Sequence, residues 1–189
     1  MFFVECKKNH IPTPETILLS EKMKVVSQEV KKFSKWPLIL KRVSGTCGEY
    51  VGRADNFGEV KKIIKKFWKK GSERLPIIAQ EFIHSPTYRV TIIGDEIVQA
   101  ILKKNSNWKA TGVYAKRVRK FKVDKDLKAL IKKILKVTKI RISGIDLLKK
   151  NDKWLVLEIN AQPAFSFIET EKEKLIKKVF KFLIKEAKK

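Results

Sequence analysis

Two segments near the C-terminal end of the chain constrain the fold most, because they bring acidic and amide side chains onto what read as neighbouring strands. The first is Gly144-Ile145-Asp146, and the second runs from Trp154 to Pro163. Side chains alternate along a strand, so one face of the second segment is expected to carry Trp154, Val156, Glu158 and Asn160.

The polar stretch Lys149 to Lys153 between these segments is typical of a hairpin loop. Asp146 is therefore expected on the adjacent antiparallel strand. A loop of odd length, for example 151–153, would set Asp146 directly across from Glu158 with Cβ atoms about 5 Å apart. A slip of one residue would put the two carboxylates on opposite faces.

Two carboxylates at this separation repel each other unless a cation or a shared proton compensates for their charge. Oxygen ligands from Asp146, Glu158 and Asn160 suit Mg²⁺ or Mn²⁺ rather than zinc. An ordinary hairpin whose acidic side chains face water fits the same pattern equally well. The pattern alone leaves both interpretations open.

Length and composition point to an intracellular protein with its own core. The 189 residues are 43% hydrophobic, and Cys6 and Cys47 are the only cysteines, without metal-type spacing. The apolar start Phe2-Phe3-Val4 is interrupted by charge, and no later apolar run has spanning length. We expect a cytoplasmic protein without disulfides and without a membrane partner.

The net charge of +24 would ordinarily direct attention to nucleic acids. The lysines, however, recur in pairs on the outer faces of predicted amphipathic helices, as at Lys61-Lys62 and Lys132-Lys133. No aromatic-basic stacking motif accompanies them. We therefore expect polyanionic ligands such as nucleotides, and no dedicated nucleic-acid partner.

The pattern of elements predicts an α+β protein without internal repeats. Helices are expected at 2–9, from Ser20 as N-cap to about 33, around 60–68, around 127–135 and at 171–188. Strands are expected at 16–19, 37–42, 50–53, 77–83, 89–93 and 96–102, besides the two acidic segments. The polar break near residue 75 suggests two α+β lobes, 1–75 and 76–189, with antiparallel sheets and a cleft between them.

Three further pieces could serve such a cleft. Lys41 ends an apolar strand just before the small-residue loop Ser44 to Gly48, where a lysine and backbone N–H groups can meet phosphate. The strand Gln80-Glu81-Phe82-Ile83 offers backbone groups that could hold an adenine edge. Arg89 and Lys103 are cations on successive strands. Each piece alone is equally compatible with an ordinary strand or a solvent-facing cation.

Taken together and in this order, these residues resemble the ATP-grasp superfamily, in the branch of RimK-like and LysX-like carboxylate–amine ligases. The resemblance covers nearly the whole chain. The motifs that carry it are Ile11 to Thr16, Leu40-Lys41, Gly45 to Gly48, Gln80 to Ile83, Tyr88-Arg89-Val90, Trp108, Gly144 to Asp146 and Glu158 to Phe165.

The resemblance implies an ATP-grasp fold and a role for each motif. Lys41 resembles the lysine that contacts phosphate, and Gly45, Thr46 and Gly48 resemble the loop over the triphosphate. Gln80, Glu81, Phe82 and Ile83 resemble the linker that holds adenine. Arg89 and Lys103 stand where the family has catalytic cations facing phosphate or the acyl intermediate, and Asp146, Glu158 and Asn160 resemble its metal ligands.

The reaction implied by the resemblance uses ATP with Mg²⁺ or Mn²⁺ to activate a carboxylate as an acyl-phosphate, which an amine then attacks. The expected partners are a nucleotide and a small or peptide carboxylate and amine substrate.

Family members carry an N-terminal domain that precedes the region seen here. Three explanations stay open: the true start lies upstream of Met1, a separate chain supplies that domain, or the protein is a degenerate relative. The alternative function is an inactive basic module that binds nucleic acid or protein. Oligomeric state is left open.

Overall fold

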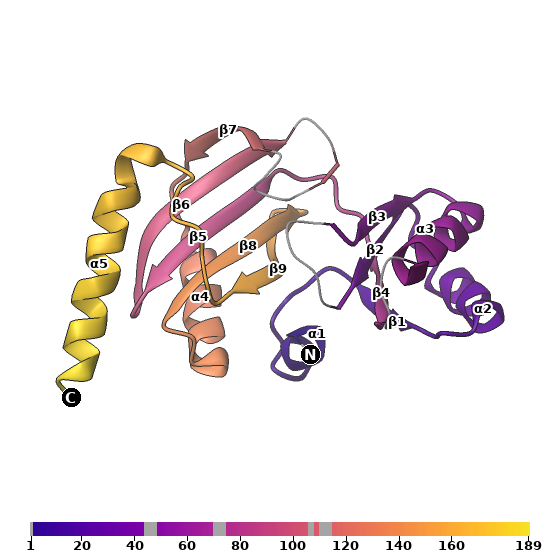
Figure 1. The fold of residues 1–189 in the computed structure, drawn as a ribbon, viewed down its shortest axis with the longest axis horizontal. Helices are drawn as coiled ribbons and strands as arrows, with labels where there is room; N and C mark the ends of the chain where they lie inside the picture. Colours follow the sequence, from indigo (N-terminus) through magenta and orange to yellow (C-terminus); the bar gives the residue numbers. More distant parts are fainter. Residues whose placement is uncertain (1, 44–48, 70–74, 106–107, 110–114) are drawn as a thin grey trace. The chain divides into compact units, whose positions relative to one another are not determined.

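The computed structural model describes residues 2–43, 49–69, 75–105, 108–109 and 115–189. Contacts between Cα atoms divide the chain into two compact units (Figure 1). Unit 1 comprises Met1–Glu5 and Thr13–Ile83, and unit 2 comprises Cys6–Pro12 and His84–Lys189. The two lobes that we expected from the sequence, 1–75 and 76–189, remain a prediction.

Unit 1 is built on a four-stranded antiparallel sheet in the order β1-β4-β2-β3. The first helix, α1 (Phe2–Lys8), begins in unit 1 and ends in unit 2. The other elements of unit 1 are β1 (Thr16–Leu19), α2 (Met23–Phe33), β2 (Leu38–Arg42), β3 (Val51–Ala54), α3 (Phe57–Lys69) and β4 (Ile77–Glu81).

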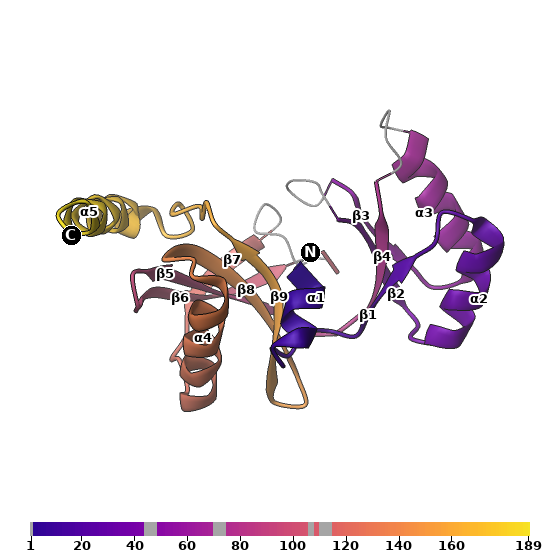
Figure 2. The same ribbon diagram turned by 90° about the horizontal axis from the view of Figure 1, so that it is seen from below.

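Helices α2 and α3 cover one face of this sheet (Figures 1 and 2). Their apolar residues recur at helical spacing, so each helix turns one stripe toward the strands. Val26 and Val30 of α2 and Val60, Ile64 and Phe67 of α3 are buried in one cluster with Leu38, Leu40, Ile77 and Ala79 of the sheet. Alternate residues of β2 and β4 therefore belong to the core, and the residues between them belong to the opposite face.

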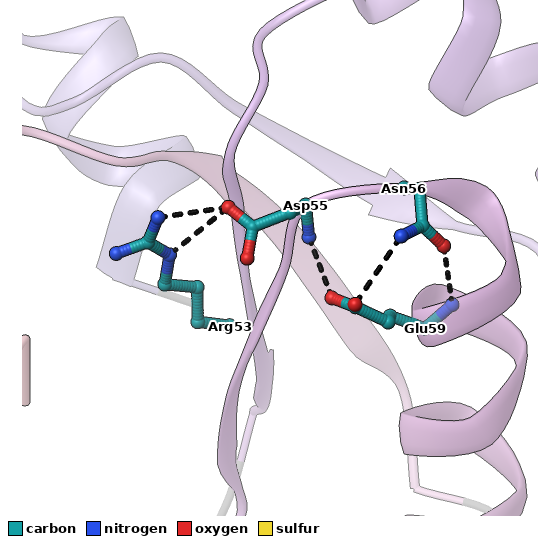
Figure 3. Close-up of polar contacts among 4 residues, drawn as sticks. All are labelled: Arg53, Asp55, Asn56 and Glu59. Atoms are coloured by element: carbon teal, nitrogen blue, oxygen red, sulfur yellow. Dashed lines mark hydrogen bonds and ion pairs between the residues drawn. The ribbon is translucent and has the colours of Figure 1, made fainter.

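A capping box begins α3 (Figure 3). The Oδ1 atom of Asn56 accepts a hydrogen bond from the backbone N–H of Glu59 at 3.0 Å. The Glu59 carboxylate reaches back to the N–H of Asp55 at 2.8 Å and to the side-chain amide of Asn56 at 3.2 Å. These contacts satisfy N–H groups that the first turn of a helix leaves without partners.

Unit 2 contains a five-stranded antiparallel sheet in the order β7-β6-β5-β8-β9. Its elements are β5 (Thr87–Ile93), β6 (Glu96–Asn105), β7 (Ala115–Lys120), α4 (Lys125–Thr138), β8 (Ile142–Lys150), β9 (Lys153–Asn160) and α5 (Glu169–Ala187). Helix α4 lies on one side of the sheet, and the connection from β9 to α5 runs along the other (Figure 2). The predicted α+β class with antiparallel sheets is confirmed.

Asp124 and Trp154 join α4 to the sheet. Asp124 is the N-cap of α4, and its Oδ1 atom accepts a hydrogen bond from the N–H of Leu127 at 2.7 Å. The same carboxylate accepts from the indole N–H of Trp154 at 2.9–3.0 Å. The Trp154 ring packs edge-on against Tyr88, with centroids 4.8 Å apart. One side chain thus caps the helix and fixes it to β9.

Most predicted elements are confirmed, and two details are wrong. Helix α2 begins at Met23 after Lys22 rather than after Ser20, whose hydroxyl oxygen accepts from the N–H of Lys22 at 3.2 Å. Strand β7 was not predicted, because its sequence AKRVRK is mostly cationic and lacks apolar alternation. Charge is tolerated there since β7 is an edge strand. No helix within the described parts of the chain has the length and apolar character of a transmembrane span.

Replacing Asn56 by alanine removes the acceptor that caps α3. We expect Asn56→Ala to lower the free energy of unfolding by about 1 kcal/mol, measured by urea titration. Asn56→Ser keeps an acceptor oxygen at the cap without placing a second carboxylate beside Glu59, and it should lose less stability than Asn56→Ala. Equal stability of the alanine variant and the wild type would contradict the capping role.

Asp124 should make the stability of unit 2 depend on pH. Burial raises the pKa of Asp124, but hydrogen bonds from Leu127 and Trp154 and the nearby Lys149 outweigh burial, so the pKa lies below its ordinary value of 3.8. A lowered pKa gives stability that is fully present above that ordinary value and is lost as the pH falls through the folded-state pKa. Asp124→Ala should therefore cost about 1 kcal/mol at pH 6.

The difference between Asp124→Ala and the wild type should shrink as the pH falls below 3.8. Denaturant titrations followed by tryptophan fluorescence at several pH values would measure it. A difference that grows on acidification would show that the carboxylate does not stabilise α4 in its charged form.

Candidate functional site

The β8–β9 hairpin brings the two predicted acidic residues together. Asp146 pairs directly with Glu158, and Gly144 pairs with Asn160. The turn is the two-residue loop Asn151-Asp152, with φ of 48° and 60°, rather than the odd-length loop that we predicted. A two-residue turn alone would pair Asp146 with Leu157.

A β-bulge restores the predicted pairing. The register shifts between Asp146 and Leu147, which pair with Glu158 and Val156, so Leu157 is the additional residue on β9. The bulge also corrects one prediction: Trp154 and Val156 do not share a face with Glu158 and Asn160. They pair with Lys149 and Leu147, which alternate along β8 with Gly144 and Asp146.

Asp146 lies at the centre of a buried ionic cluster. Its Oδ2 atom accepts a hydrogen bond from Nη1 of Arg89 at 3.0 Å, and its Oδ1 atom accepts one from Nζ of Lys103 at 2.8 Å. The exposed fractions of Asp146, Arg89 and Lys103 are 7%, 5% and 0%. Both predicted catalytic cations therefore meet the first predicted metal ligand, on the face of the sheet away from α4. The three formal charges sum to +1, and the exposed carboxylate of Glu158, which pairs with Asp146, brings the formal sum to zero.

Two neighbours shape the room around these cations. A Cβ atom added to Gly144 would lie 2.1 Å from Nη2 of Arg89, so the guanidinium occupies space that only glycine leaves. The ring of Phe167, in the connection between β9 and α5, lies over both cations. Its centroid is 5.0 Å from Cζ of Arg89 and 5.4 Å from Nζ of Lys103.

The chemistry of the donor set fits a hard divalent cation. Asp146, Glu158 and Asn160 offer oxygen ligands on one face of adjacent strands, and each oxygen of Asp146 keeps a lone pair besides the one used for a cation. Glu158 is exposed, whereas Asp146 is buried. No group of three His, Cys, Asp or Glu residues suited to a metal occurs within the described residues. A metal here would thus use two carboxylates and the Asn160 amide.

In unit 1 the predicted phosphate lysine is held by a chain of side-chain hydrogen bonds. Lys41 donates from Nζ to Oε1 of Gln80 at 2.7 Å, and Nε2 of Gln80 donates to the Thr16 hydroxyl at 2.9 Å. That hydroxyl donates to the carbonyl of Pro14 at 2.8 Å. These residues lie on the sheet face away from α2 and α3, because Leu38 and Leu40 alternate with Ile39 and Lys41.

The linker predicted to hold adenine, Gln80 to Ile83, begins within β4 and continues past its end at Glu81. The N–H of Glu81 donates to the carbonyl of Glu15 at 2.9 Å, and the N–H of Phe82 donates to the carbonyl of Pro37 at 3.2 Å. Those two donors are engaged within unit 1. An adenine edge would have to use the remaining backbone groups, including the N–H of Ile83. The predicted loop residues Gly45, Thr46 and Gly48 lie outside the described residues.

Two residues at these sites were not predicted. Thr16 accepts a hydrogen bond from Gln80, and only a structural role was predicted for its strand. Phe167 lies over the cation pair and belongs to the segment that connects β9 to α5. The only signal for Thr16 was the Ile11 to Thr16 motif. Phe167 gave no signal, since the connection from Ala161 to Ile168 has no helical or strand periodicity.

The buried cluster predicts a large stability effect. Asp146→Asn would leave two buried cations without a negative partner, and we expect a loss of about 3 kcal/mol or more in the free energy of unfolding. Asp95→Asn is the matched control, because Asp95 pairs with Arg141 at 3.2 Å but is mostly exposed. The control should cost less than about 1 kcal/mol. Equal costs in denaturant titrations would show that burial of the cluster is not what stabilises it.

Comparison with known proteins identifies the family of the chain. A family model described as the RimK-like ATP-grasp domain matches residues 5–183. The alpha-aminoadipate–LysW ligase LysX of Saccharolobus solfataricus is 27% identical over 164 residues, which are 84% of this chain and 58% of the relative. A probable alpha-L-glutamate ligase of Legionella pneumophila is 30% identical over 158 residues, 80% of this chain and 51% of the relative. The chain thus spans little more than half the length of these relatives.

Solved structures show the same fold. A RimK-domain ATP-grasp protein of Sphaerobacter thermophilus superposes with a TM-score of 0.72 at 15% identity, covering 95% of this chain and 64% of that one. The D-alanine–D-alanine ligase of Bacillus anthracis also gives 0.72, at 16% identity, covering 98% and 66%. The chain has the ATP-grasp fold, and it belongs to the RimK-like ATP-grasp family.

Proposed function

We propose that this chain is the ATP- and Mg²⁺-binding part of a ligase that joins a carboxylate to an amine. The observation that carries the proposal is the direct pairing of Asp146 with Glu158, in the same cluster that holds Arg89 and Lys103. Membership of the RimK-like family and the ligase names of its relatives support it. We assign Mn²⁺ as the alternative metal, because the donors are oxygen atoms.

The reaction has two displacements. A carboxylate oxygen of the substrate attacks the γ-phosphorus of ATP and ADP leaves; an amine nitrogen then attacks the acyl carbon, phosphate leaves, and the nitrogen loses a proton. When bound, the metal would neutralise charge on the transferring phosphoryl group. Asp146, Glu158 and Asn160 hold the metal in this proposal, while Arg89 and Lys103 supply positive charge to the phosphoryl or acyl-phosphate oxygens.

Unit 1 supplies the other nucleotide contacts. In this proposal the Lys41 ammonium, whose Nζ donates to Oε1 of Gln80 at 2.7 Å, contacts a phosphate. Gln80 and Thr16 fix the direction of that ammonium, so less rotamer entropy is lost when it meets a phosphate. In this proposal backbone groups of Gln80 to Ile83 hold the base. The family resemblance alone assigns Gly45, Thr46 and Gly48, which lie outside the described residues, to the triphosphate.

The substrate class follows from the relatives rather than from the described residues. The names of two relatives specify glutamate in one case and alpha-aminoadipate with LysW in the other, and the ATP-grasp ligase PsnB was solved in complex with a precursor peptide. We therefore propose an amino-acid or peptide substrate. The relatives contain a part that has no counterpart here. In this proposal that part, supplied in the same or a separate chain, determines which substrate is used. The use of ATP as cosubstrate favours a cytoplasmic location.

Metal-dependent ATP binding tests the proposal. Calorimetric titration should show ATP binding that requires Mg²⁺, and we expect Glu158→Ala to weaken it by at least about tenfold, since a charged ligand to the metal is lost. Lys41→Ala should weaken it by a similar factor through lost phosphate contact. Glu173→Ala, an exposed acidic residue of α5, is the control and should bind as the wild type.

ATP binding that ignores both Mg²⁺ and Glu158→Ala would overturn the proposal. Salt-sensitive binding to bulk RNA or DNA, unchanged in Glu158→Ala, would instead support a basic binding module.

A further inference from the structure

Phe167 contacts both buried cations of unit 2. Its ring is over the guanidinium of Arg89 and over the ammonium of Lys103 at once, with 5.0 Å and 5.4 Å from the centroid. Lys103 is 0% exposed although its side chain is among the longest in the protein. Phe167 itself is half-buried, so one part of its ring meets solvent while its face lies over the cations.

The contact is favourable for electrostatic reasons. Asp146 supplies one negative charge against the two positive charges of Arg89 and Lys103, and the Nε atom of Arg89 is buried with no hydrogen-bond partner among the described residues. The negative face of an aromatic ring attracts cations and offsets part of this excess. Excluding water also strengthens the ion pairs beneath the ring.

The segment that carries Phe167 is tied at both ends. It follows Asn160, which pairs with Gly144 beneath the guanidinium, and it ends where α5 begins at Glu169. Glu171 accepts a hydrogen bond from Nε2 of Gln99 at 2.9 Å and pairs with Lys120. The contact with Lys120 and then that with Gln99 lower the pKa of Glu171. The segment is therefore held over β5 and β6, and the Phe167 side chain has a defined place.

We propose that Phe167 is a positioning residue for the ligase reaction: it holds Arg89 and Lys103 against Asp146, keeps water from them, and turns aside when an anionic substrate group reaches Lys103. The last step follows because a fully buried ammonium cannot contact an anion until its cover moves. This inference rests on the proposed function. It adds that the connection after Asn160 controls which groups reach the cation pair.

Lysine acetylation followed by mass spectrometry tests this directly. In the wild type, Lys103 should react with a pulse of acetic anhydride far more slowly than its exposed neighbour Lys104. In Phe167→Ala the Lys103 rate should rise about tenfold relative to Lys104, because the cover is gone. Phe167→Tyr keeps the ring and should restore slow labelling.

Further variants separate the ring from general loosening of the segment. Phe165→Ala removes another phenylalanine two positions earlier and should leave the Lys103 rate unchanged. Phe167→Leu keeps apolar volume without an aromatic face, so it should label at an intermediate rate and serves if Phe167→Ala does not fold. Melting curves recorded in parallel would reveal global unfolding.

Unchanged Lys103 labelling in Phe167→Ala and Phe167→Leu, or an equal rise in Phe165→Ala, would overturn the inference. The measurement needs neither ATP nor Mg²⁺. Slow wild-type labelling that Phe167→Ala accelerates would therefore support the covering role even if ATP binding ignored both Mg²⁺ and Glu158→Ala. That second result would overturn the proposed function alone.

Discussion

A single buried carboxylate, Asp146, organises the candidate site of unit 2. Its two oxygens accept hydrogen bonds from Arg89 and Lys103, so three charges that would each be costly to bury alone are buried together. Gly144 leaves room for the guanidinium, and the hairpin register sets Glu158 opposite the same carboxylate. The cations, the proposed metal ligands and the sheet that carries them thus depend on one side chain.

The sequence allowed the pairing of Asp146 with Glu158 to be predicted, but not the way in which it arises. Hydrophobic alternation locates both strands, and the polar run between them indicates a hairpin. Nothing in that pattern distinguishes a three-residue loop from a two-residue turn with Leu157 as a bulge. Because alternation was counted straight through the bulge, Trp154 was assigned to the wrong face. The bulge separates a face that packs on Tyr88 from a face that carries the polar cluster.

Contacts between distant residues mark the limit of prediction. Motif order was enough to name Lys41 and Gln80, and the strands that carry them were predicted well. The hydrogen bond between these side chains, and its continuation to Thr16, requires the strand order β1-β4-β2, which no local pattern encodes. The contact of Phe167 with the two cations likewise could not be predicted, because it depends on the position of the β9–α5 connection over β5 and β6. The edge strand β7 escaped prediction because its charges conceal the alternation.

Paramagnetic broadening by Mn²⁺ in the presence of ATP tests the central claim most directly. With the backbone amide signals assigned, the account predicts that broadening is strongest at residues 144–146 and 158–160, and weak at the distant turn 151–152. This result would place the metal between the two strands that carry Asp146 and Glu158. Broadening centred on other acidic residues, such as Asp95 or Glu171, or spread evenly over the lysine-rich surface, would contradict it.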